Sequence, residues 1–262
     1  MQNFEFVKPS TVADAVKALK QDGAQALSGG MTLLPTMKQG LAAPDVLVCL
    51  TGIKETQGVR VEGGALVIGG ATIHAVAAKE ARKSYPALAD LAGGIGDPAV
   101  RNRGTIGGSL ANNDPSACYP AAVLASGATI ITDRRKIAAD DYFQGMFSTA
   151  LEEGEIITGV SFPIPEKAAY VKFEQPASRF ALTGVFVAKY PSGVRVAVTG
   201  ASENGVFRWT EAEKALSANF AASAIANLTV PAKGMIADLH GTPAYRANLA
   251  KVLTGRAVAQ AR

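Results

Sequence analysis

The pattern of apolar and polar positions predicts a small α/β unit in about the first 55 residues. A partial capping pair, Thr11 and Asp14, precedes a run with helical spacing. The apolar face of this helix is formed by Val12, Ala15, Val16 and Leu19. The predicted elements are, in order, a strand at 4–7, a helix from 11, a strand at 24–27, a helix to 37 and a strand at 45–50.

A second unit is predicted from residue 56 to about residue 165. Two alternating runs flank Gly63-Gly64, which is typical of a hairpin turn. Beyond the hairpin the pattern predicts a helical stretch at 73–95, a long polar loop at 97–115, a helix and strand at 121–132, and a strand at 156–165. Pro163 and Pro165 close that strand, and we take them as the domain boundary.

Beyond residue 165 the pattern changes to a strand meander. Strands are predicted at 168–175, 181–190 and 194–202, and helices at 210–217 and 243–259. A turn at Pro191-Ser192-Gly193 joins the last two strands. We therefore expect an α+β fold that ends in a compact domain, residues 166–262, with helices behind a three-stranded sheet.

Composition narrows the function classes. Hydrophobic residues make up 48% and charged residues 18%, which excludes a disordered chain. The net charge of +4 comes from scattered basic residues, so we expect no nucleic-acid partner. No apolar run approaches the length of a membrane span, and the first residues lack the features of a signal peptide. We expect a cytoplasmic protein.

Cysteine and histidine are scarce. The two cysteines, Cys49 and Cys118, provide neither a disulfide framework nor a cysteine-only metal site. The two histidines, His74 and His240, form no metal-binding motif of familiar spacing, and His74 is expected to cap or pack a helix. Any redox activity must therefore come from a cofactor.

Two glycine pairs lie in segments that could bind an anion. Ser28-Gly29-Gly30 stands between a predicted strand and a predicted helix, which is also the setting of a plain turn. Gly107-Gly108 lies in the polar segment 97–120, among hydroxyl and amide side chains. Arg101 and Arg103 in that segment could neutralise phosphate or pair with surface acids. Two such turns suit the adjacent phosphates of a dinucleotide such as FAD better than a mononucleotide.

Longer motifs carry a resemblance to a known family. The stretches SGGMTLLPTMKQGLAAPDVLVCL and IGDPAVRNRGTIGGSLANNDPSACYPAAVLA resemble the FAD-binding medium subunits of molybdenum hydroxylases. This family includes carbon monoxide dehydrogenase, aldehyde oxidoreductase and xanthine dehydrogenase. The resemblance implies a two-lobed FAD-binding domain of the vanillyl-alcohol-oxidase type over residues 1–165, with lobes of about 1–55 and 56–165. The α+β domain at 166–262 would follow it.

The resemblance also implies the cofactor contacts. The residues expected to hold the pyrophosphate are Ser28, Gly29, Gly30, Met31, Thr32, Thr105, Ile106, Gly107, Gly108 and Ser109. Leu33 is expected to contact the cofactor beside them. Further contacts are implied at Asn113, Asp114, Cys118 and Lys172. Ile95 and Ile157 would lie near the isoalloxazine ring, or are ordinary core residues.

This sequence departs from the family pattern at three of these sites. Met31 stands where many relatives have a polar residue, so only its backbone can donate a hydrogen bond. Cys118 stands where many have a cofactor-contacting Asp. Glu174 stands where eukaryotic relatives have a flavin-contacting Lys, and Lys172, two residues away, is the expected substitute.

The function implied by the resemblance is electron transfer. FAD in this chain would receive electrons from [2Fe-2S] clusters on a small subunit, and a large molybdopterin subunit would oxidise the substrate. We expect a dimer of such heterotrimers. The alternatives are a self-contained flavin oxidoreductase of the vanillyl-alcohol-oxidase type and a binding module that has lost flavin. Valine at Gly107 or Gly108 is expected to abolish FAD binding and leave the fold largely intact.

Overall fold

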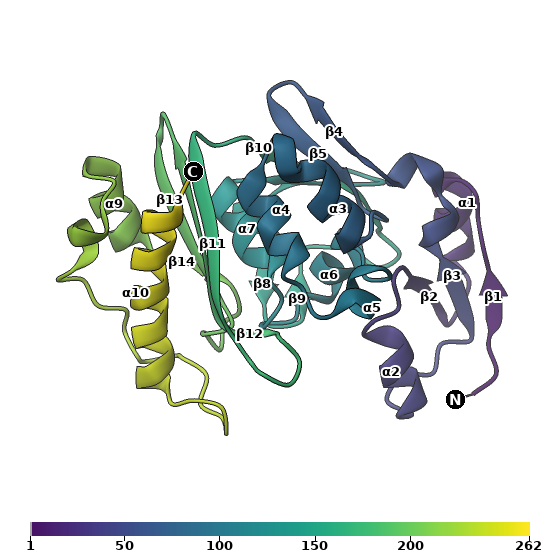
Figure 1. The fold of residues 1–262 in the computed structure, drawn as a ribbon. Coiled ribbons are helices and arrows are strands. Elements are labelled where there is room, and N and C mark those ends of the chain that lie inside the picture. Colours follow the sequence, from purple (N-terminus) through teal and green to yellow (C-terminus); the bar gives the residue numbers. More distant parts are fainter. Residues whose placement is uncertain (1) are drawn as a thin grey trace.

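A computed structural model describes residues 2–262 and shows three parts side by side (Figure 1). The N-terminal lobe lies at one side, a central lobe follows it, and the C-terminal domain lies at the other side with its longest helix on the outer face. In this described part of the chain, no helix is long and apolar enough to cross a membrane.

The N-terminal lobe is a parallel three-stranded sheet in the order β1-β3-β2. Its elements are β1 (Glu5–Val7), α1 (Val12–Ala18), β2 (Ala24–Leu27), α2 (Leu33–Lys38), β3 (Val46–Cys49) and the 3₁₀ turns η1 (Leu50–Gly52) and η2 (Lys54–Thr56). The predicted cap of α1 is confirmed, because the Thr11 hydroxyl accepts a hydrogen bond from the Asp14 N–H. Strand β2 delivers the chain to the Ser28-Gly29-Gly30 turn.

The central lobe is an antiparallel five-stranded sheet in the order β4-β5-β10-β6-β7. Its strands are β4 (Val59–Glu62), β5 (Ala65–Gly69), β6 (Thr129–Thr132), β7 (Lys136–Ala138) and β10 (Ile157–Pro163). The small hairpin of β8 (Phe143–Gly145) and β9 (Ser148–Thr149) lies apart from this sheet. The predicted hairpin turn is confirmed, since Gly63 and Gly64 both have positive φ and Glu62 pairs with Ala65.

Helices pack around this sheet (Figure 1). They are α3 (His74–Glu80), the 3₁₀ turn η3 (Ala81–Lys83), α4 (Pro86–Gly93), α5 (Pro98–Arg101), α6 (Ile106–Asn112), α7 (Tyr119–Ser126) and α8 (Ala139–Tyr142). Of these, α4 and α7 lie between the sheet and the C-terminal domain. The helical stretch expected at 73–95 is therefore interrupted before Pro86, as the missing N–H of proline favours a new helix start.

The polar loop expected at 97–115 is wrong, because this segment contains α5 and α6. Each helix begins at a side chain that accepts a backbone hydrogen bond, Asp97 for α5 and Thr105 for α6. The helices are short, and α6 contains two glycines, so neither shows the apolar spacing that marks a helix in the sequence.

The C-terminal domain is an antiparallel sheet in the order β11-β12-β13-β14. Its elements are β11 (Lys167–Glu174), β12 (Ala181–Tyr190), β13 (Gly193–Thr199), β14 (Phe207–Arg208), α9 (Thr210–Ala218), the 3₁₀ turn η4 (Ala222–Ile225) and α10 (Pro243–Gln260). The expected three-stranded sheet is thus wrong by one strand. With only two residues, β14 is too short to show strand alternation.

Both faces of this sheet are covered, which explains the nearly continuous apolar run of β12. Val185 and Val187 face the cluster that contains α10, whereas Phe186 and Ala188 face the central core with α4 and α7. The C-terminal domain is therefore joined to the central lobe by apolar packing. The predicted boundary near residue 165 falls in the connection between β10 and β11.

Candidate functional site

A cleft of about 460 Å³ lies between the N-terminal lobe and the central lobe. Both glycine pairs that the sequence singled out reach it. Of the predicted site residues, the cleft is lined by Ser28, Gly29, Gly30, Met31, Thr32, Leu33, Thr105, Gly107, Gly108, Ser109, Asp114 and Ile157. Residues far apart in sequence therefore converge on one site.

The first turn presents free backbone donors. In the described part of the chain, no acceptor is found for the backbone N–H groups of residues 29–33. Gly30 has a φ of +70°, so the chain reverses here in the left-handed region before α2 begins at Leu33. Successive free N–H groups around such a residue form a concavity suited to an anion.

The second turn uses its donors differently. The N–H groups of Ile106 and Gly107 donate to the carbonyls of Thr72 and Gly70, and the Gly108 N–H donates to the Thr105 hydroxyl. These hydrogen bonds fix the start of α6 against the end of β5. The second turn therefore lines the cleft with the side-chain-free Gly107 and Gly108 and with Ser109, and not with these N–H groups.

The two turns are held in direct contact. The Ser28 and Thr105 hydroxyl oxygens are 2.7 Å apart and share a hydrogen bond. Gly29 lies so close to the backbone of Arg103 and Gly104 that a Cβ on Gly29 would overlap the Arg103 carbonyl. Glycine at 29 is thus required by contact within the protein, whatever the turn binds.

Two predicted site residues are structural. Ile106 is completely buried in the central core. Asn113 has a φ of 43°, and its side-chain amide donates to the carbonyls of Gly145 and Ser148 at 2.8 and 2.9 Å. Asn113 therefore holds the β8–β9 turn against the end of α6.

Ile95, Cys118 and Lys172 lie outside the cleft lining, where α4, α7 and β11 meet. The Lys172 ammonium donates to the carbonyls of Gly94 (2.7 Å) and Arg179 (2.6 Å), and it lies 3.9 Å from the Cys118 sulfur. Burial raises the pKa of the Cys118 thiol, and the nearby Lys172 charge offsets part of that rise. Lys172 and Cys118 thus make a polar contact outside the cleft lining, and Ile95 packs against the central core.

Arg101 neither lines the cleft, where it could neutralise phosphate, nor pairs with an acidic side chain in the described residues. Its guanidinium donates to the carbonyls of Ile95 and Gly96 at 3.1 and 2.8 Å. Arg101 thus supports the loop before α5. Arg103 is exposed, and its main-chain carbonyl forms the surface against which Gly29 packs.

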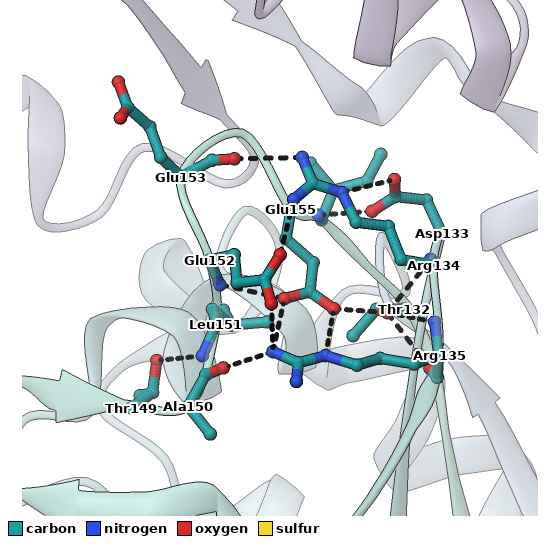
Figure 2. Close-up of polar contacts among 11 residues, drawn as sticks. Thr132, Asp133, Arg134, Arg135, Thr149, Ala150, Leu151, Glu152, Glu153 and Glu155 are labelled. Atoms are coloured by element: carbon teal, nitrogen blue, oxygen red, sulfur yellow. Dashed lines mark hydrogen bonds and ion pairs between the residues drawn. The ribbon is translucent and has the colours of Figure 1, made fainter.

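Glu155 lines the cleft and was missed from the sequence. Figure 2 shows its carboxylate held by Arg135, which donates from Nε at 3.1 Å and from Nη2 at 3.0 Å. The Thr132 hydroxyl and the Glu152 N–H also donate to it. Burial alone would raise the pKa of Glu155, but these donors lower it to about 2. The carboxylate is therefore a fixed anchor for the segment that leads into Ile157.

His74 is the second missed residue in the cleft lining. Its side chain does not cap α3, and the residue as a whole is 4% exposed. Burial, with a smaller effect from the Arg101 charge, lowers the pKa of His74 to about 4. No sequence signal separates such a histidine from one that merely packs.

Comparison with known proteins identifies the protein family of this chain. Residues 2–165 match the family described as the FAD binding domain in molybdopterin dehydrogenase. The chain belongs to the FAD-binding medium subunits of molybdenum hydroxylases, the family of carbon monoxide dehydrogenase and xanthine dehydrogenase. It is thus a flavoprotein-type subunit of an oxidoreductase, with an FAD-binding domain followed by an α+β region.

Individual relatives cover nearly the whole chain. It is 32% identical to the carbon monoxide dehydrogenase medium chain of Hydrogenophaga pseudoflava over 97% of this chain and 96% of that one. It is 31% identical to the nicotine 6-hydroxylase medium subunit of Paenarthrobacter nicotinovorans over 98% and 96%. Among solved structures, quinoline 2-oxidoreductase from Pseudomonas putida 86 superposes with a TM-score of 0.88 at 26% identity, over 99% of this chain and 96% of that one.

Proposed function

We propose that the cleft binds FAD, with the pyrophosphate against the turn at residues 29–33. The observation that carries this proposal is the run of free N–H groups in that turn, beside the hydroxyls of Ser28 and Thr105. A cleft between two lobes also suits an extended dinucleotide. In this proposal residues 1–165 form the two-lobed domain of the vanillyl-alcohol-oxidase type, and residues 166–262 form a separate domain.

The residues of this chain bind and orient the cofactor. Gly29 brings the two turns together, and Gly107 lets α6 approach the end of β5. Glu155 fixes the backbone next to Ile157, which lines the cleft. FAD would supply the redox chemistry when bound. A direct flavin contact of Ile95, Cys118 and Lys172 stays a prediction.

We further propose that the chain works as the electron-transfer subunit of a larger cytoplasmic complex. Relatives that cover nearly all of this chain are medium subunits of enzymes that act on carbon monoxide or nicotine. Because similar medium chains serve such different substrates, the substrate is set by a large molybdopterin subunit. A small subunit with [2Fe-2S] clusters would supply the electrons, in a dimer of heterotrimers, and an external acceptor would take them up.

The test has two arms on the full chain. Chromatography of the chromophore released from the purified protein should identify FAD; FMN, or no flavin after reconstitution, refutes the binding proposal. The isolated chain, assayed with aldehydes, purines and carbon monoxide, should show no substrate-dependent flavin reduction. Reduction by the chain alone would favour the self-contained oxidoreductase instead.

A further inference from the structure

His74 stands on the cleft wall next to the contact between the two turns. Its main-chain N–H donates to the Gly104 carbonyl at 2.9 Å, and its ring centroid lies 5.3 Å from that of Tyr119. A Cβ on Gly104 would come within 2.6 Å of the His74 Nε2 atom, so this edge of the ring lies against the Gly104 backbone. Gly104 itself lines the cleft and contacts Gly29.

The ring nitrogens of His74 have no partner within residues 2–262. Nδ1 is buried and makes no hydrogen bond, and no protein partner is found for Nε2 in the same residues. Leaving a buried N–H unpaired costs about 1–3 kcal/mol, so the proton belongs on the nitrogen that can reach a partner. Nε2 is that nitrogen, because it is not sealed from the surface as Nδ1 is, and His74 and its neighbour Gly104 both line the cleft.

The neighbours of His74 indicate what the partner is. Gly104 is in contact with Gly29, the first residue of the turn that carries the free N–H groups. Ile73 forms a β-bridge with Thr105, whose hydroxyl bonds to Ser28. An anion held by the first turn would therefore lie against the same stretch of cleft wall as His74.

We propose that the His74 imidazole donates a hydrogen bond from Nε2 to a pyrophosphate oxygen of the dinucleotide and so positions it in the cleft. This inference rests on the proposed function. A neutral donor strengthens binding by a hydrogen bond without adding a charge. Its loss should therefore weaken the affinity but leave the salt dependence of binding unchanged.

Three variants of the full chain test the inference. His74→Phe and His74→Met keep an apolar side chain of similar size and remove the donor, whereas His74→Gln keeps an N–H donor. After flavin removal, each protein is titrated with FAD, and ADP is measured as a competitor. We expect the Phe and Met variants to lose about tenfold in affinity for both ligands, and the Gln variant to stay within about threefold of the wild type.

The outcomes distinguish a His74 that positions the pyrophosphate by a hydrogen bond from a His74 that only fills space in the core. Wild-type affinity in a folded Phe or Met variant, or a Gln variant as weak as the Phe variant, would mean that the ring only fills space. A loss for FAD without a loss for ADP would refute the pyrophosphate contact. If one apolar variant does not fold, the other decides. Failure of the wild-type chain to bind FAD would instead refute the proposed function itself.

Discussion

Replacement of Gly107 by alanine should destabilise the protein even without a ligand. The added Cβ would lie 2.6 Å from the Gly70 carbonyl oxygen, where ordinary contacts begin at 3.4 Å. The backbone must then separate by several tenths of an ångström, which weakens the 2.9 Å hydrogen bond from the Gly107 N–H to the same oxygen. The expectation that Gly107→Val spares the fold is thus wrong on this geometry, and Gly107 has no positive φ that glycine would have to supply.

The magnitude follows from two opposing effects. Overpacking and the weakened hydrogen bond cost about 2–4 kcal/mol. Alanine recovers roughly 1 kcal/mol, because it is a better helix former than glycine and residue 107 lies in α6. We expect a net loss of about 2 kcal/mol, or roughly 4–8 °C in the Tm of the flavin-free chain. Urea unfolding followed by circular dichroism measures it.

Gly108→Ala is the matched control in the same helix. Its Cβ would meet the Thr105 hydroxyl at 3.0 Å and the Ser28 Cβ at 3.5 Å, both on the cleft side. The stability of this variant should stay within about 1 kcal/mol of the wild type, while its FAD affinity falls. Equal stability of the Gly107 and Gly108 variants would refute the close approach of α6 to β5.

Three further predictions concern charged and titratable groups. Glu155→Gln should lower the free energy of unfolding by about 2 kcal/mol near pH 7.5 in urea titrations, because charge-assisted hydrogen bonds from Arg135 are lost. The difference from the wild type should shrink as the pH falls from 4.5 to about 2, because over this range the Glu155 carboxyl of the unfolded chain binds a proton while the native carboxylate stays ionised. Since burial holds the folded-state pKa of His74 near 4, below its usual 6.5, the unfolded chain binds more protons at pH 5, and stability should fall by about 2 kcal/mol between pH 7.5 and about pH 5. His74→Phe should remove that fall, and an unchanged pH profile would contradict it. Lys172→Met should destabilise the contact between β11 and α4, since the Gly94 carbonyl loses its donor; Tm is the measurement, and no change would show that this hydrogen bond is dispensable.

Periodicity predicted the regular elements of this fold well where a segment has one buried face. The helix from Val12 and the hairpin around Gly63-Gly64 are confirmed, because capping and turn chemistry are local and visible in the sequence. Strand β12 was found as an apolar run, although its burial on both faces becomes evident only from the packing of α10 and α7.

Elements without a local signal were missed. Segment 97–115 contains two short helices whose residues are mostly small or polar, so its composition is typical of a loop. The position of Glu155 in the cleft depends on a bidentate contact with Arg135, which is distant in sequence. Both cases depend on tertiary contacts that outweigh local pattern.

The two glycine turns show most clearly why a site cannot be derived from motifs alone. Both have a hydroxyl residue, a glycine pair and a helix start, and their sequences suggest equal roles. In the structure the free N–H groups belong to residues 29–33. The corresponding N–H groups of Ile106 and Gly107 already donate to the carbonyls of Thr72 and Gly70. The contact of the second turn with the end of β5 therefore leaves the N–H groups of Ile106 and Gly107 unavailable to a ligand. The glycines at 29 and 107 are required by contact between protein segments, whatever the cleft binds.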